Sequence, residues 1–397
     1  MPLLCNPFSA DSRSLAAFRA CLGGLVAWEA LSLLADPSLL TDHGPLPLSV
    51  LHARVWQRGS VLWSLHAMSG GEVVIRLLLC AQFCFALSLA LAYRPRASAL
   101  CCWALVTSAG TRNPLATHGG DSLLRIELLL ASLIPLKPSQ CSRRVSSLPV
   151  GLLLFQPLLM YFVAATLKCS HSWRDQLTAV HLTLHLDMAA KPLAVQLRRL
   201  HWLTRLASLL TPYVELCAPL LLLCPIARAR RWAVAIGLAI LLLLQLSFLC
   251  CLVLGNFPWI STISIIPFLP SSTWNRWWEP RRESNKESPV ARRVSSGAAA
   301  MIGCWVLLWN VEHHCTLLRA YRENECPDCS RCLSCSLPVR MPFYMRSFGE
   351  LLALHQSWDL FAPEVSSDVS LRSAQKCSWI GHRQGSRLGA QIEARLI

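Results

Sequence analysis

A run of seventeen residues without a charged side chain, residues 151–167, constrains this chain more than any other feature. The run ends at a single lysine, Lys168, and a short aromatic-containing stretch continues to Trp173. An α-helix needs about 17–25 mostly apolar residues to cross the hydrocarbon core of a bilayer. We therefore predict a membrane-spanning helix over residues 148–167, with Lys168 at its end.

The composition of the whole chain indicates the same environment. The chain is 54% hydrophobic and only 15% charged, whereas soluble domains carry about 25% charged residues. The formal net charge is +15, but the basic residues fall in short clusters between apolar stretches. That distribution is typical of orientation in a membrane and not of a phosphate-binding face. We predict a lipid bilayer as the partner, and no nucleic acid.

The order of apolar stretches predicts an all-α, polytopic membrane helix bundle of about eight or nine spans. The expected spans are residues 15–35, 72–93, 97–109, 122–136, 148–167, 203–223 and 232–254, a shorter piece ending at 269, and residues 297–311. Residues 169–202 are too polar to cross but are periodic, so we expect one or two amphipathic helices there, on the lumenal side.

These spans divide the chain into four parts. Residues 1–275 form the membrane domain, residues 276–296 a basic polar linker, residues 297–311 a terminal span and residues 312–397 a polar, cysteine-containing tail. Basic turns favour the cytosol, which leaves Lys168 at the lumenal or extracytosolic end of its helix. We expect a multi-pass protein of the endoplasmic reticulum or another endomembrane. If residues 256–269 re-enter instead of crossing, the tail changes sides.

Lys168 has two interpretations. A lysine at the rim of a bilayer can snorkel, with its stem on apolar surface and its ammonium among the headgroups. Alternatively, removal from water disfavours the ammonium form, and a neutral amine can act as a base or nucleophile. No carboxylate close in sequence holds the lysine charged, although Asp175 is near enough to compete.

Three further residues are candidates for chemistry. Asp121 suits the N-cap of the helix that follows paired glycines, or it belongs with His118 to a functional turn on the same membrane face as Lys168. Glu215 lies inside an apolar span, where acids are costly and usually functional. The structural alternative for Glu215 is an ion pair with Arg125 or Arg76.

Metal ligation is weakly signalled, and we predict no metal site. His181 and His185 have the spacing of two ligands on one helical face, but no third ligand is evident. Four cysteines between Cys326 and Cys335 suit either a metal or, in an oxidising lumen, disulfides.

Several motifs in a fixed order resemble the horizontally transferred transmembrane (HTTM) domain family, which includes the membrane part of vitamin K-dependent gamma-carboxylases. The matching motifs are TDHGPLP at Thr41, WSLHAMSG at Trp63, RNPLATHGGDSLLR at Arg112, YFVAATLKCSHSW at Tyr161, LTPYVELCAPLLL at Leu210, GNFPWIS at Gly255, IPFLPSSTW at Ile266 and QSWDLFAP at Gln356. In that family an Asn-His pair assists the lysine, where this chain carries Gly120-Asp121. The family's large lumenal region corresponds to the tail beyond Val311.

The resemblance implies a function. It implies that Lys168 is the base that deprotonates vitamin K hydroquinone or another lipophilic quinol during carboxylation of protein glutamate, a lyase-type reaction. Asp121, His118 and Glu215 would support the lysine, and Tyr161 and Trp173 would contact the cofactor. The alternative is a non-catalytic maturation factor, related to the lipase maturation factors, that binds a secretory client protein.

Overall fold

A computed structural model describes residues 6–54, 63–134, 144–186, 189–275, 289–325 and 341–352, together with residues 354 and 356. The described chain is almost wholly helical, which confirms the predicted all-α class. Its only strand pair joins β1 (Ala10–Asp11) antiparallel to β2 (Arg144–Val145). The helices are α1 (Ser12–Ala35), η1 (Pro37–Leu40), α2 (Leu48–Arg54), α3 (Glu72–Ala90), α4 (Pro95–Arg112), α5 (Gly119–Leu133), α6 (Leu148–Leu167), α7 (His171–Arg174), α8 (Ala179–Thr183), α9 (Pro192–Leu197), α10 (His201–Leu222), α11 (Ala227–Cys251), α12 (Phe257–Ser264), η4 (Ile266–Phe268), α13 (Ser271–Trp274), α14 (Pro289–Glu325) and α16 (Phe343–Leu351).

Six helices in the described residues are long and apolar enough to cross a membrane: α1, α3, α6, α10, α11 and residues 292–317 of α14. The chain is therefore a multi-pass membrane protein, but the expected total of eight or nine spans is not confirmed. The remaining expected spans correspond to α4, α5 and α12. These helices are shorter or more polar than a lipid-facing span requires.

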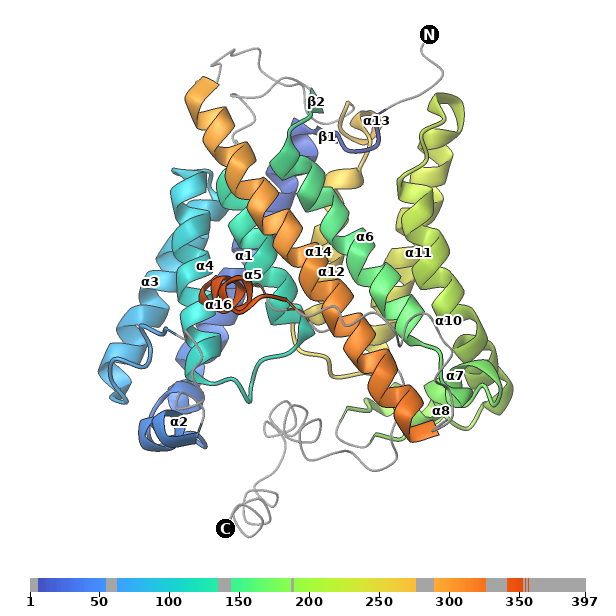
Figure 1. Ribbon diagram of the computed structural model, residues 1–397, viewed down its shortest axis with the longest axis horizontal. Helices are drawn as coiled ribbons and strands as arrows, with labels where there is room; N and C mark the ends of the chain where they lie inside the picture. Colours follow the sequence, from blue (N-terminus) through green and yellow to red (C-terminus); the bar gives the residue numbers. More distant parts are fainter. Residues whose placement is uncertain are drawn as a thin grey trace.

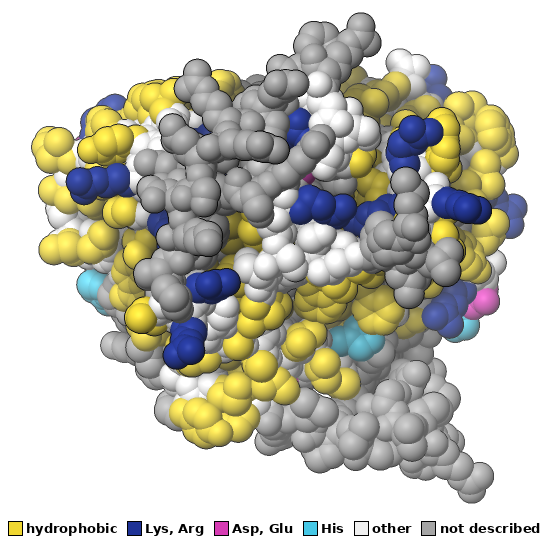
Figure 2. Space-filling view, turned by 90° about the horizontal axis from the view of Figure 1, so that it is seen from above, with side chains coloured by type: hydrophobic (Ala, Val, Ile, Leu, Met, Phe, Trp, Pro, Cys, Tyr) yellow, Lys and Arg dark blue, Asp and Glu magenta, His cyan; other side chains and the backbone are white. Residues whose placement is uncertain are grey.

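The helices form one bundle with two ends (Figure 1). We call them the Ser12 end, where α1 and α6 begin, and the Lys168 end, where α6 stops. β1 and β2 pair at the Ser12 end, and Arg96 at the start of α4 donates to the carbonyl of Ile134 just after α5. Figure 2 shows arginine and lysine side chains spread among apolar ones on this end. Its placement in the cytosol stays a prediction.

The short central helix α5 explains how a bundle can include spans that are not fully apolar. Eleven of its fifteen residues are buried, because α4, α6, α12 and α14 all pack against it. A helix enclosed by protein does not need to meet lipid, so it tolerates charged side chains at membrane depth. α1 behaves similarly on one face: Arg19 is buried and donates to the carbonyls of Leu89 and Ala90, at 2.5 and 2.7 Å.

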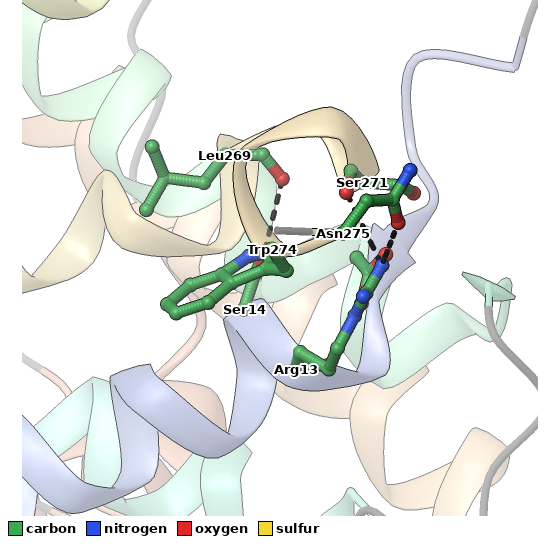
Figure 3. Close-up of polar contacts among 7 residues, drawn as sticks. Arg13, Ser14, Leu269, Ser271, Trp274 and Asn275 are labelled. Carbon is green, nitrogen blue, oxygen red and sulfur yellow. Dashed lines mark hydrogen bonds and ion pairs between the residues drawn. The ribbon is translucent and has the colours of Figure 1, made fainter. Parts of the chain in front are cut away.

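Residues 256–269 cross the interior of the bundle. At one end, Asn256 bonds to Asp121 in the first turn of α5. At the other end, the Leu269 carbonyl accepts from Ser14 at the start of α1, and Trp274 donates to the same Ser14 hydroxyl (Figure 3). The segment therefore connects the Lys168 end to the Ser12 end, and α14 begins at the Ser12 end.

The periodic segment between α6 and α10 forms three helices of only four, five and six residues, α7, α8 and α9. They lie at the Lys168 end, where Lys191 donates to the carbonyl of Leu249 near the end of α11.

The described part of the tail packs on the bundle at mid-height. Figure 1 shows α16 nearly end-on in front of α4 and α5, with α14 beside it. Three indoles donate to its backbone or to the residues after it: Trp305 to Met345, Trp63 to Leu351 and Trp309 to Gln356. Buried Gln356 also accepts from Gln156 in the middle of α6. This segment is therefore part of the membrane domain's packing.

Candidate functional site

Lys168 leaves the helical conformation and ends α6, with φ −78° and ψ 64°. Its side chain folds back along the last turn, so that Nζ donates to the carbonyl of Ala164 at 3.2 Å. The side chain is only 5% exposed. The amine is thus held inside the bundle and does not extend to the surface as a snorkelling lysine would.

Glu215 of α10 is the ion-pair partner of Lys168. The Nζ to Oε2 distance is 2.6 Å, and the Glu215 side chain is 6% exposed. The expected pairings of Glu215 with Arg125 or Arg76 are wrong: Arg76 instead pairs with Glu72 one turn earlier in α3. Asp175 does not compete for the lysine, because it pairs with His171. The carboxylate that meets Lys168 comes from 47 residues away in sequence.

Two aromatic residues frame the pair, and both were expected near it. The ring of buried Trp173 has its centroid 5.4 Å from Lys168 Nζ, within reach of a cation–π contact. Tyr161 lies two helical turns deeper on α6 and accepts a 2.7 Å hydrogen bond from Gln245 of α11. The other amide atom of Gln245, Oε1, is buried without a partner.

His118 and Asp121 form a second polar cluster. His118, not Asp121, occupies the N-cap position of α5. Asp121 is the third residue of the helix and completes a capping box: its Oδ2 accepts from the backbone N–H of His118 at 2.8 Å. Its Oδ1 accepts from the Asn256 side chain at 2.9 Å. Gly255 has φ +60°, and a Cβ there would lie 2.2 Å from His118 Nε2, so this approach requires glycine.

The two clusters lie toward the same end of the bundle but are separate in the described residues. No hydrogen bond or ion pair joins Lys168 to His118 or Asp121; the polar partners of the lysine are Glu215 and the Ala164 carbonyl. Asp121 instead interacts electrostatically with Arg125 and with Glu29 of α1. Only Glu215 and Trp173 of the expected supporting residues therefore contact the lysine.

The described residues contain no group of three or more histidine, cysteine or acidic side chains suited to a metal ion. The rings of His181 and His185 lie close together but tilted by 54°, with centroids 4.3 Å apart, and the His201 ring centroid lies 5.0 Å from that of His181. The cysteines from Cys326 to Cys335 lie outside the described residues.

The arrangement defines a class: a multi-pass integral membrane protein that buries a lysine–glutamate pair near one end of its helices. No protein-family model matches the chain, and comparison with curated proteins and with solved structures gives no match.

Sequence reasoning missed two residues that complete these clusters, Gln245 and Asn256. A signal for each exists in the sequence. Gln245 is the one side-chain amide within the apolar stretch of α11, where an amide needs a partner. Asn256 follows Gly255 at the break between two apolar stretches, a position where a side-chain amide can bond a neighbouring helix end.

Proposed function

We propose that this protein is a membrane-embedded, gamma-carboxylase-like enzyme of the HTTM family in which Lys168 acts as a base toward a lipophilic quinol. The observation that carries the proposal is the buried Lys168–Glu215 pair, with Nζ and Oε2 2.6 Å apart. A buried lysine is a group whose proton affinity responds strongly to its surroundings. The motif order of the sequence supports the same family.

The pair can hold one proton in two ways. In the charged form Lys168 is an ammonium and Glu215 a carboxylate. Movement of that proton along the short hydrogen bond gives a neutral amine beside a neutral carboxylic acid. The proposed reaction uses the neutral form, since burial in general disfavours separated charges. In this form the Nζ lone pair can accept a proton from an acidic hydroxyl, while Glu215 retains its own.

Two features near the pair support a flat, lipophilic quinol as the ligand. Trp173 supplies a buried aromatic face beside the amine. Gln245 Oε1 is a buried acceptor without a hydrogen-bond partner among the described residues, and so it can receive a hydroxyl hydrogen bond. A bound quinol would supply the acidic hydroxyl and the reducing equivalents. Tyr161 would keep the Gln245 amide oriented through its 2.7 Å hydrogen bond.

The test is incorporation of labelled carbon dioxide into a glutamate-containing peptide by the purified protein with reduced vitamin K. We expect Lys168→Ala to lose incorporation by about 100-fold or more, the scale of a lost general base. Glu215→Gln should also reduce it. Arg205→Gln, which changes an exposed residue of the same helix α10, serves as the matched control. Absence of incorporation by the wild type contradicts the enzyme proposal.

One observation favours the alternative of a non-catalytic maturation factor for secretory clients. The lysine amine is already satisfied by Glu215, the Ala164 carbonyl and the Trp173 ring. An amine so fully engaged suits a structural lock between α6 and α10. Co-purification of a secretory client with both the wild type and Lys168→Ala, without label incorporation by either, would support this function.

A further inference from the structure

A lateral cavity lies at the Ser12 end of the bundle, away from Lys168. Its volume is about 420 Å³, and its walls come from the first turns of α4, the last turns of α5 and the third and fourth turns of α14. Leu100, Leu129 and Met301 represent the three walls. Phe348 and Leu352, in and just after α16, form the fourth side.

The depth of the cavity follows from the helices that line it. Arg96 is the second residue of α4, and Leu100 lies one turn deeper, about 6 Å along the axis. On α14, exposed Arg292 and Arg293 precede the lining residue Ala298 by one to two turns. The cavity therefore begins near the charged boundary of the bundle and extends into its apolar part. α16, held at mid-height by the indoles of Trp305 and Trp63, limits how deep it reaches.

The cavity opens toward the bilayer. Leu100 is 47% exposed and Met301 is 60% exposed, although both line it. We expect lipid, and not water, to fill an apolar opening of this size at membrane depth, because water in an apolar space finds no hydrogen-bond partners. An acyl chain matches the leucine, methionine and phenylalanine surface.

The charges at the rim select among lipids. Arg96 of α4 lines the cavity itself. Arg94 directly precedes α4, and Arg292 and Arg293 lie one to two turns before the lining residue Ala298 on α14, toward the same end of the bundle. Two acidic residues are equally near in sequence to the lining positions: Glu350 of α16, two residues from Phe348, and buried Glu127 of α5, two residues from Leu129. Among the described residues in this region, the four arginines outnumber the two acids, and guanidinium groups bind phosphate oxygens with two parallel hydrogen bonds.

We propose that this cavity binds one anionic phospholipid, with its phosphate among the arginines of α4 and α14 and one acyl chain in the cavity above α16. The site is separate from the Lys168–Glu215 pair and does not depend on the proposed enzymatic function. It gives the described tail segment a role, because α16 supplies one side of the binding site.

The experiment uses the full chain reconstituted in vesicles of equal parts phosphatidylglycerol and phosphatidylcholine, then extracted in mild detergent and weighed by native mass spectrometry. We expect one retained phosphatidylglycerol per chain. Ala298→Trp, which fills the cavity, should lower retention roughly tenfold. Ala300→Trp, an exposed position on the same helix that does not line the cavity, should retain lipid like the wild type.

A charge variant keeps the test decisive if the tryptophan variant does not fold. Arg292→Gln with Arg293→Gln changes only exposed side chains, and we expect it to lose the preference for phosphatidylglycerol. Arg228→Gln with Arg231→Gln, on α11 at the same end, is its control. Equal retention of both lipids by the wild type overturns the proposal, as does a folded Ala298→Trp that retains phosphatidylglycerol normally.

Discussion

Among the described residues, two ion pairs have both side chains buried, one toward each end of the bundle, and they are built differently. At the Ser12 end, Arg13 donates from Nε and a terminal nitrogen to the two oxygens of Asp11, at 3.0 and 2.9 Å. The same guanidinium reaches the Ser271 carbonyl and Asn275 Oδ1, at 3.2 and 3.1 Å (Figure 3). At the other end, Lys168 meets one carboxylate oxygen of Glu215 and one carbonyl.

The contrast shows that burial of an ion pair does not by itself define a reactive site. Arginine keeps its proton at any physiological pH and offers five donors in a fixed plane, so the Arg13 pair ties the start of α1 to α13. Lysine can give up its proton, and its partner here is a single flexible carboxylate. Of the two pairs, only the Lys168 pair has a cation capable of proton transfer.

Removal of Glu215 should produce the largest loss of stability. Glu215→Ala leaves the Lys168 ammonium buried with only the Ala164 carbonyl and the Trp173 ring, and removing one partner of a buried pair costs about 3–5 kcal/mol. The measurement is a denaturant titration of the purified protein in mixed micelles, followed by tryptophan fluorescence. Tyr213→Ala, at an exposed position of α10, is the control. A loss below about 1 kcal/mol would show that the pair is not buried in solution.

The second prediction concerns pH and compares two buried groups, His66 and, at the Ser12 end, Asp11. His66, before α3, is fully buried, and burial together with the charge of Arg112 lowers its pKa to about 4. As pH falls, the unfolded chain therefore binds a proton before the folded chain does. The contribution of neutral His66 to the free energy of unfolding is fully present above about pH 6.5 and is lost as the pH falls toward 4. The loss is about 3 kcal/mol at 1.36 kcal/mol per pKa unit.

Asp11 should respond only at lower pH. Its burial raises the pKa of the carboxyl, but hydrogen bonds to Arg13 and Ser271 outweigh burial and hold it below its usual 3.8. Its contribution is therefore kept above about pH 4 and is lost as pH falls through the lowered pKa. Thermal unfolding between pH 7 and 4.5 should show the decline in the wild type and not in His66→Phe. An equal decline in both would assign the effect to another group.

The sequence predicted the helices better than their contacts. The span expected over residues 148–167 is the observed α6, because a charge-free run bounded by a lysine determines a helix locally. α4, α5 and α12 do not meet the length and hydropathy expected of a membrane-spanning helix. They are short or carry polar side chains, which neighbouring helices contact or enclose. Hydropathy reports exposure to lipid, and α5, with eleven of its fifteen residues buried, is largely shielded from lipid by its neighbours, whereas α4 still exposes Leu100.

The partner of Lys168 could not be deduced from the sequence. Glu215 was singled out as a buried acid, but several cations were equally available to it. The choice depends on how α6 and α10 pack, with Lys168 near the end of one helix and Glu215 in the body of the other. Likewise, nothing in α16 alone indicates that Trp63, far away in sequence, donates to its last residue.

A paired replacement by apolar residues is the third way to test the comparison. Lys168→Met with Glu215→Leu removes both charges, and the free energy of unfolding should stay within about 1 kcal/mol of the wild type, since such replacements are often neutral. Asp11→Leu with Arg13→Met should cost about 2–3 kcal/mol. In that variant the N-cap of α1 is lost, and Asn275 and the Ser271 carbonyl lose their donor.

The same paired variant at the Lys168 end separates the two candidate functions. A structural lock would be replaced by apolar packing, so client binding would persist in Lys168→Met with Glu215→Leu. A catalytic amine would not be replaced, and label incorporation would be lost although the protein is stable. Loss of both stability and activity would contradict the view that the pair contributes little net folding energy.

The smallest expected effect comes from making the Ser12 end resemble the other end. Arg13→Lys keeps the positive charge but loses the planar fork, so the amine cannot hold both Asp11 oxygens, Ser271 and Asn275 in the same geometry. We expect a loss of about 1–2 kcal/mol, by comparison with charge-assisted hydrogen bonds of that size. Arg231→Lys, at an exposed site, should change the free energy of unfolding by less than about 0.5 kcal/mol. If Arg13→Lys also changes the free energy of unfolding by less than about 0.5 kcal/mol, the planar guanidinium does not stabilise this end. The Arg13 and Lys168 pairs would then differ only in the proton affinity of the cation.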